Sequence, residues 1–150
     1  MTKPISTRVH GVLDYMTAAF LHTLPRVMGW SPRATALLDT AGVAATAYSV
    51  MTRYELGLVR VLPMKTHLTL DAISGAGLIG AALLMEDEDP DVRATIAAIG
   101  LWEVGASLLT ESRSSRPANK TVREAARKAD RNVRKAVLTA AENAGAVQGL

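Results

Sequence analysis

Residues 67–85 read HLTLDAISGAGLIGAALLM, and this stretch decides the fold. Asp71 is its one acidic residue. If the stretch forms a helix, Gly, Ala, Leu and Ile occupy all faces of that helix. A helix of a water-soluble bundle needs an outward polar face, and this stretch supplies none. Its length is close to the roughly 20 residues with which a helix crosses a bilayer. The stretch therefore predicts a transmembrane helix.

Three further stretches of similar length share this composition, and each of the four contains one acidic residue. They predict an all-α fold with a four-helix transmembrane domain over residues 1–110. A second interpretation, Ala-rich helices buried in a water-soluble protein, stays open because an acidic residue inside a membrane costs about 2.5–3.5 kcal/mol. The four stretches are 9–24, 34–52, 67–85 and 92–110.

Charge divides the chain into two unlike parts. The 150 residues carry a formal net charge of +3, yet residues 113–150 hold nine Lys/Arg against three Asp/Glu. The absence of cysteine excludes disulfide frameworks, thiolate metal sites and cysteine nucleophiles. The sequence contains no phosphate-binding loop, nucleophile elbow or metalloprotease motif, so we do not expect an enzyme.

Basic residues around the four stretches predict their orientation. Lys3 and Arg8 precede the first stretch, three more bases lie between the second and third, and the basic tail follows the fourth. The opposite side holds Arg26, Arg33 and the acidic run 86–91. Because cytoplasmic loops carry the excess of Lys and Arg, we expect a bacterial inner-membrane protein with both termini in the cytoplasm.

The chain matches itself at a fixed offset. Shifting it by 57 residues places His10 and Asp14 on His67 and Asp71, each pair preceded by a base, and a shift of 58 matches Gly, Ser and Thr in the second half of each copy. The pattern predicts two helical-hairpin repeats, about 5–52 and 62–110, inserted parallel to each other. Chance similarity between apolar helices is the alternative.

Three short motifs carry a resemblance to a known group of proteins. TRVHGVLDY (7–15) opens the first stretch, LPRVMGW (24–30) closes it, and YELG (54–57) precedes the second repeat. This combination resembles small uncharacterised bacterial integral membrane proteins, some of which are described by a Ser-Pro-Trp (SPW) repeat. The resemblance covers roughly residues 5–110, although Leu24-Pro25-Arg26 departs from a Ser-Pro-Trp core. It implies a four-span fold without an established activity and lends no catalytic residues.

Ionisable side chains converge near the cytoplasmic end of the predicted helices. Positions four apart share a helix face, so His10 can meet Asp14 and His67 can meet Asp71. At about 1.5 Å of rise per residue, both aspartates and Glu103 lie roughly 10 Å from the cytoplasmic edge. Ionisable residues inside a membrane are candidates for a functional site. The candidate metal or ligand layer is His10, Asp14, His67, Asp71 and Glu103.

Three interpretations of this layer remain open. In the structural one, each aspartate accepts hydrogen bonds from its own histidine and from first-turn backbone amides. In the second, imidazoles and carboxylates of facing helices bind a divalent metal. The third is a proton- or substrate-linked path using Asp71 and Glu103, or a haem held between His10 and His67. The sequence favours no cofactor among these.

The C-terminal segment differs from the rest of the chain. Residues 111–120 have the composition of a linker, and residues 121–150 predict a basic amphipathic cytoplasmic helix. Such a helix can contact anionic lipid or a protein partner, or lie solvated. No fold or aromatic platform for nucleic acid accompanies the charge. The predicted contact residues are Arg123, Arg127, Lys128, Arg131, Arg134 and Lys135.

These features suggest two functions. The first is a small inner-membrane scaffold or accessory protein whose tail engages anionic lipid or a protein partner. The alternative is a membrane-embedded metal-binding, haem-binding or transport module built on the His/Asp layer. Either function is compatible with a homo-oligomer, and the sequence specifies no transported species.

Overall fold

A computed structural model of the chain describes residues 3–113 and 120–147. Its regular structure is entirely helical across these residues, which confirms the all-α prediction. The chain divides into two compact units, residues 1–117 and 118–150. The helices are α1 (Thr7–Val27), α2 (Pro32–Met51), α3 (Met64–Leu84), α4 (Pro90–Leu109) and α5 (Lys120–Val147).

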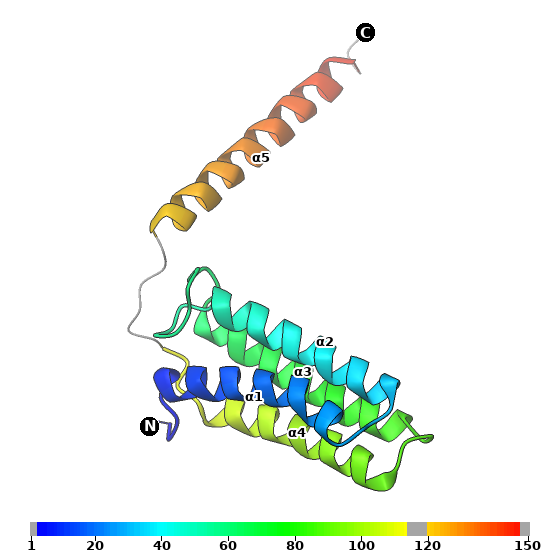
Figure 1. Cartoon of the computed structure of the whole chain (residues 1–150). Helices are drawn as coiled ribbons and strands as arrows, with labels where there is room; N and C mark the ends of the chain where they lie inside the picture. The colour runs from blue at the N-terminus through cyan, green and yellow to red at the C-terminus, as the bar shows by residue number, and fades with distance from the viewer. Residues whose placement is uncertain (1–2, 114–119, 148–150) are drawn as a thin grey trace. The chain divides into compact units, whose positions relative to one another are not determined.

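The first unit pairs its four helices in chain order. α1 packs mainly on α2, and α3 packs mainly on α4. The α1–α2 and α3–α4 connections lie at one end of the four helices, and the N-terminal segment and the α2–α3 connection lie at the other (Figure 1). Residues near the starts of α1 and α3 therefore share one end of the unit with residues near the ends of α2 and α4.

Local sequence signals set the helix boundaries. Ser31 caps α2 by accepting a hydrogen bond from the backbone amide of Ala34 at 3.0 Å, and Pro32 follows at the first helical position, where its missing N–H costs nothing. Pro25 lies inside the last turn of α1, which ends two residues later. Gly29 then takes a φ of 64°, the left-handed conformation that commonly follows a helix.

α3 and α4 touch through their backbones. A Cβ added to Gly75 would lie 2.4 Å from the carbonyl oxygen of Gly100, and a Cβ added to Gly100 would lie 2.4 Å from that of Gly75. Only glycine permits this approach at both positions. A Cβ added to Gly77 or Gly80 would have no atom within 4 Å, so among these three glycines of α3 it is Gly75 that allows the close contact with α4.

Apolar side chains fill the end of the unit that holds the α1–α2 and α3–α4 connections. Four of them are 0% exposed, namely Leu21, Ala34, Leu38 and Ile96. The opposite end has a different interior, because its buried residues are mostly polar. The apolar cluster consists of Leu21, Ala34, Leu38, Leu78, Ala82, Met85, Val92, Ile96 and Ile99.

The two hairpins have matching dimensions. α1 and α3 each have 21 residues and begin 57 positions apart, while α2 and α4 each have 20 residues and begin 58 positions apart. Two isolated parallel bridges close the polar end: Ile5 pairs with Thr110, and Leu62 pairs with Thr52. In each bridge, the end of one hairpin meets the beginning of the other.

Two of the described helices, α3 and α4, are long and apolar enough to cross a membrane. Only 33% of each apolar window is buried within the protein, so most of this apolar surface faces outward. α1 and α2 are long enough but less apolar. Exposed large apolar side chains nevertheless occur on all four helices, including Met16, Phe20, Val43, Ile73, Leu101 and Leu108.

The second unit contains the 28-residue helix α5. It begins at Lys120, one residue before the predicted start. Five of the six predicted basic contact residues have described side chains, and all five are exposed. The side chain of Arg123 lies outside the described residues.

Candidate metal centre

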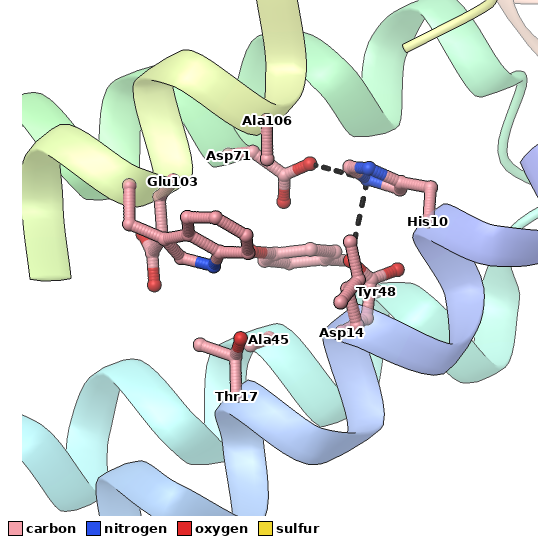
Figure 2. Close-up of a pocket in the computed structure, with 10 residues that line it drawn as sticks. His10, Asp14, Thr17, Ala45, Tyr48, Asp71, Glu103 and Ala106 are labelled. Carbon is pink, nitrogen blue, oxygen red and sulfur yellow. Dashed lines mark hydrogen bonds and ion pairs between the residues drawn. The ribbon is translucent and has the colours of Figure 1, made fainter. Parts of the chain in front are cut away.

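The polar end of the four-helix unit gathers side chains from all four helices. Figure 2 shows His10 and Asp14 of α1, Tyr48 of α2, Asp71 of α3 and Glu103 of α4 around a common space. The candidate layer predicted from sequence therefore lies in one region of the interior. Within it, four residues form a tighter group.

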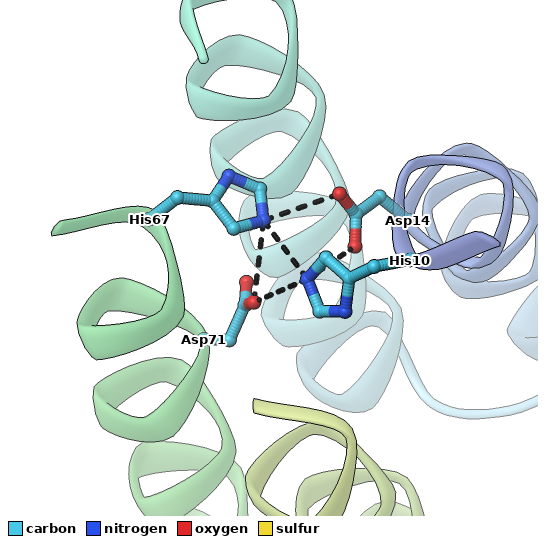
Figure 3. Close-up of side chains that lie close together, drawn as sticks. All are labelled: His10, Asp14, His67 and Asp71. Carbon is cyan, nitrogen blue, oxygen red and sulfur yellow. Dashed lines mark hydrogen bonds and ion pairs between the residues drawn. The ribbon is translucent and has the colours of Figure 1, made fainter. Parts of the chain in front are cut away.

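His10, Asp14, His67 and Asp71 point at one another from α1 and α3 (Figure 3). Each offers one ligand atom, and all four atoms lie within 4.8 Å of one another. The four side chains are between 0% and 9% exposed. Two imidazoles and two carboxylates thus share a volume from which bulk water is excluded.

Each imidazole faces both carboxylates. His10 Nε2 lies 3.0 Å from the Asp71 carboxylate and 3.2 Å from that of Asp14, its own helix neighbour. His67 Nε2 lies 3.1 Å from Asp14 and 3.2 Å from Asp71. The predicted contacts within each helix are therefore present, and equally close contacts between the helices join them into one cluster.

Threonine hydroxyls fix the tautomer of both histidines. Thr52 Oγ1 lies 2.8 Å from His67 Nδ1 and 2.6 Å from the carbonyl oxygen of Tyr48. Thr110 Oγ1 lies 2.9 Å from His10 Nδ1 and 2.7 Å from the carbonyl oxygen of Ala106. A hydroxyl has one hydrogen, and a carbonyl can only accept, so each threonine donates to the carbonyl and accepts from Nδ1–H. Both Nε2 atoms then face the centre of the cluster.

This arrangement requires positive charge at the centre. The two Nε2 atoms are 3.1 Å apart, and two neutral imidazoles protonated at Nδ1 would point lone pairs at each other over that distance. Either protons on Nε2 or a metal ion must lie between the histidines and the two carboxylates. Four ligands at about 2.0–2.1 Å from a tetrahedral metal are separated by about 3.3 Å. The two Nε2 atoms and the Asp71 Oδ2 atom lie 3.0–3.2 Å from one another, close to this value. Asp14 reaches His10 through Oδ1 and His67 through Oδ2, and one ligand atom from each of the four residues can be chosen so that all lie within 4.8 Å of one another.

The cluster does not fit a haem. Axial histidines on opposite faces of a haem iron would place their nitrogens about 4 Å apart, twice a metal–nitrogen bond of about 2.0 Å, with the macrocycle between them. His10 and His67 instead have nitrogens 3.1 Å apart and ring planes at 75° to each other. The two aspartates occupy the remaining sides.

Tyr54 covers one side of the cluster and is not among the site residues predicted from the sequence. Its side chain is completely buried, and its hydroxyl donates to Asp14 at 3.1 Å. Burial and the nearby Asp14 carboxylate raise the pKa of the Tyr54 hydroxyl. Gly11 makes room for the ring, because a Cβ there would lie 2.5 Å from Tyr54 Cε2.

Glu103 lies beside the four-residue cluster and not within it. It lines the same space as His10, Asp14 and Asp71, as the depth argument predicts. Its Oε2 atom is buried and has no hydrogen-bond partner among the described residues. The third histidine, His22, lies toward the other end of α1 and pairs with Asp39 at 2.8 Å.

Comparison with protein-family models, curated proteins and solved structures finds no match to this chain. The resemblance to SPW-repeat membrane proteins therefore stays a prediction.

Proposed function

We propose that this protein is an integral membrane protein whose four-helix unit binds one divalent transition-metal ion through His10, Asp14, His67 and Asp71. The observation that carries the proposal is the pair of Nε2 atoms 3.1 Å apart, with both Nδ1 hydrogens already committed to threonine hydroxyls. A cation between these nitrogens and the two carboxylates satisfies all four groups at once.

The membrane part of the proposal rests on the outward surface. In residues 9–25, 34–51, 66–85 and 94–110, all of which are described, every ionisable residue is buried or half-buried, and the His22 side chain is 37% exposed. Large apolar side chains of these segments face outward. A water-soluble bundle has the reverse pattern, whereas lipid favours this one. All four helices are therefore proposed to span a bacterial inner membrane, with both termini cytoplasmic by the distribution of basic residues.

Matching hairpins support the proposed internal duplication. Helix lengths, starting positions and the two bridges agree with repeats 5–52 and 62–110. The threonine–histidine contacts have the same symmetry: Thr52 at the end of the first hairpin contacts His67 of the second, and Thr110 at the end of the second contacts His10 of the first. A twofold arrangement of this kind supplies two identical half-sites around one centre.

The donor set indicates the class of metal. Imidazole nitrogen with carboxylate oxygen suits zinc, iron, manganese and cobalt, whereas magnesium and calcium prefer oxygen alone. Two carboxylates balance one divalent charge, so the loaded centre is neutral and tolerable within a low-dielectric interior. Without metal, neutrality requires two extra protons on the histidines.

Metal stoichiometry tests the proposal. The full chain in detergent is loaded with Zn²⁺, freed of excess metal and analysed for zinc per protein. We expect one tightly bound ion in the wild type and its loss in the His10→Gln/His67→Gln variant. His22→Gln is the matched control because His22 lies outside the cluster. A wild type that retains no metal at micromolar Zn²⁺, while the double variant unfolds more easily, would favour a purely structural charge cluster.

A second proposed function concerns α5. Its described basic side chains Arg127, Lys128, Arg131, Arg134 and Lys135 are exposed, which supports contact with anionic lipid or an acidic partner by a scaffold or accessory protein. Deleting residues 121–150 should abolish binding to anionic vesicles or partner recovery while leaving the metal stoichiometry unchanged. Unchanged binding after the deletion would count against this function.

A further inference from the structure

A small cavity adjoins the proposed metal centre. It has a volume of about 20 Å³, which is room for one water molecule. Side chains of α1 and α4 form most of its lining, and Tyr48 and Ala45 of α2 and Asp71 of α3 complete it (Figure 2). His10, Asp14 and Asp71 belong to this lining, so three of the four proposed ligands face the cavity directly.

Glu103 supplies an unsatisfied acceptor to the same cavity. The residue is 7% exposed, and its Oε2 atom lacks a partner among the described residues. A buried carboxylate oxygen without a hydrogen bond is unfavourable, so a donor in the cavity would stabilise it. Ala45, which stands 58 positions before Glu103, also lines the cavity, and its small side chain keeps the space open.

We propose that the bound metal keeps one exchangeable coordination position facing this cavity, occupied by a water molecule that donates a hydrogen bond to Glu103. The inference rests on the proposed metal centre. Four protein ligands alone would close a tetrahedral zinc site, so the water in this position makes the metal five-coordinate. The ligand class is small, neutral and able to donate a hydrogen bond, since the Glu103 carboxylate accepts hydrogen bonds and repels anions.

Azide binding to the Co²⁺-loaded full chain in detergent tests this position. Cobalt absorption reports both coordination number and azide ligation. We expect a spectrum of higher than four-coordination and weak azide binding in the wild type. Glu103→Gln removes the carboxylate that lines the same cavity and repels an anion there, so it should tighten azide binding by at least about tenfold. Glu86→Gln, an exposed carboxylate at the opposite end, should leave azide affinity unchanged.

A second variant tests the cavity independently of the charge. Ala45→Val fills the space next to the metal, so it should retain Co²⁺ and lose the azide response. A cobalt spectrum that ignores azide in both wild type and Glu103→Gln would overturn the exchangeable position and leave the metal centre standing. An azide response that survives Ala45→Val would also overturn it. Failure to bind Co²⁺ would overturn the metal centre first and this inference with it.

Discussion

Replacing Thr110 with valine should weaken metal binding without touching a metal ligand. Thr110 is completely buried, and its hydroxyl accepts from His10 Nδ1 at 2.9 Å while donating to the carbonyl of Ala106 at 2.7 Å. Valine keeps the shape and leaves the Nδ1–H without an acceptor. That buried donor should cost about 1–3 kcal/mol of unfolding free energy in the metal-free protein.

The effect on metal affinity follows from the same hydrogen bond. The threonine fixes the tautomer and the orientation of His10, and loss of such a partner typically lowers metal affinity 10–100-fold, about 1.4–2.7 kcal/mol. Zn²⁺ competition against a chromophoric chelator in detergent measures the affinity. Thr52→Val should have the same effect through His67, because its hydroxyl makes the equivalent pair of contacts.

Thr46→Val provides the matched control. Thr46 also donates to a backbone carbonyl four residues earlier, that of Gly42 at 2.8 Å, and it is not among the hydrogen-bond partners of His10 or His67 in the described part of the chain. Its replacement should leave Zn²⁺ affinity unchanged. If Thr110→Val and Thr52→Val also bind Zn²⁺ within twofold of the wild type, the tautomer argument is wrong.

Three further changes probe the surrounding structure. Gly11→Ala should lower the unfolding free energy by about 1–3 kcal/mol in a denaturation series, because its Cβ would meet the buried ring of Tyr54 at 2.5 Å. Gly75→Ala should destabilise the protein by a similar amount or more, because the added Cβ would force α3 away from the Gly100 carbonyl. Gly77→Ala is the control: Gly77 has open space around it, so the change should be neutral or slightly stabilising. Equal effects of the two changes would refute the close crossing of α3 and α4. Because the pKa of Tyr54 is raised in the folded protein, its contribution to stability is fully present below about pH 10 and is lost above that value, where the tyrosine of the unfolded chain ionises first. The unfolding free energy should therefore fall as pH rises above about 10, and less steeply in Tyr54→Phe; identical slopes would contradict the assignment.

The sequence predicts those parts of the site that depend on one helix at a time. The spacing of His10 and Asp14, repeated in His67 and Asp71, places each pair on one helix face, and the contacts at 3.2 Å within each helix follow from it. The helical period also accounts for the all-α fold. Depth along a helix correctly brings Glu103 to the level of the aspartates.

Contacts between the two hairpins could not be predicted from the sequence. The pairing of Thr52 with His67 and of Thr110 with His10 depends on how two hairpins close on each other, which helical periodicity does not encode. The match of both threonines at the 58-residue offset is the one trace of this pairing in the sequence, and it indicates duplication without indicating which histidine each threonine contacts. Tyr54 offered no such signal, because its position follows from the fold of the α2–α3 connection.

The sequence also could not predict where a side chain lies sideways within the polar layer. Glu103 shares its depth with Asp71, yet only the packing of α4 decides that its carboxylate faces a cavity and remains outside the four-atom cluster. Hydropathy alone also supports only part of the proposed four-span arrangement. It selects α3 and α4, whereas the case for α1 and α2 comes from the outward placement of their apolar residues.

X-ray absorption spectroscopy of the Zn²⁺-loaded full chain in detergent tests the central claim most directly. We expect a first shell of nitrogen and oxygen at about 2.0–2.1 Å, with outer-shell scattering from two imidazoles that disappears when His10 and His67 are replaced by Gln. His22→Gln should leave the spectrum unchanged. Zinc surrounded only by water oxygens, or imidazole scattering that depends on His22, would contradict a metal centre formed by the two His/Asp pairs.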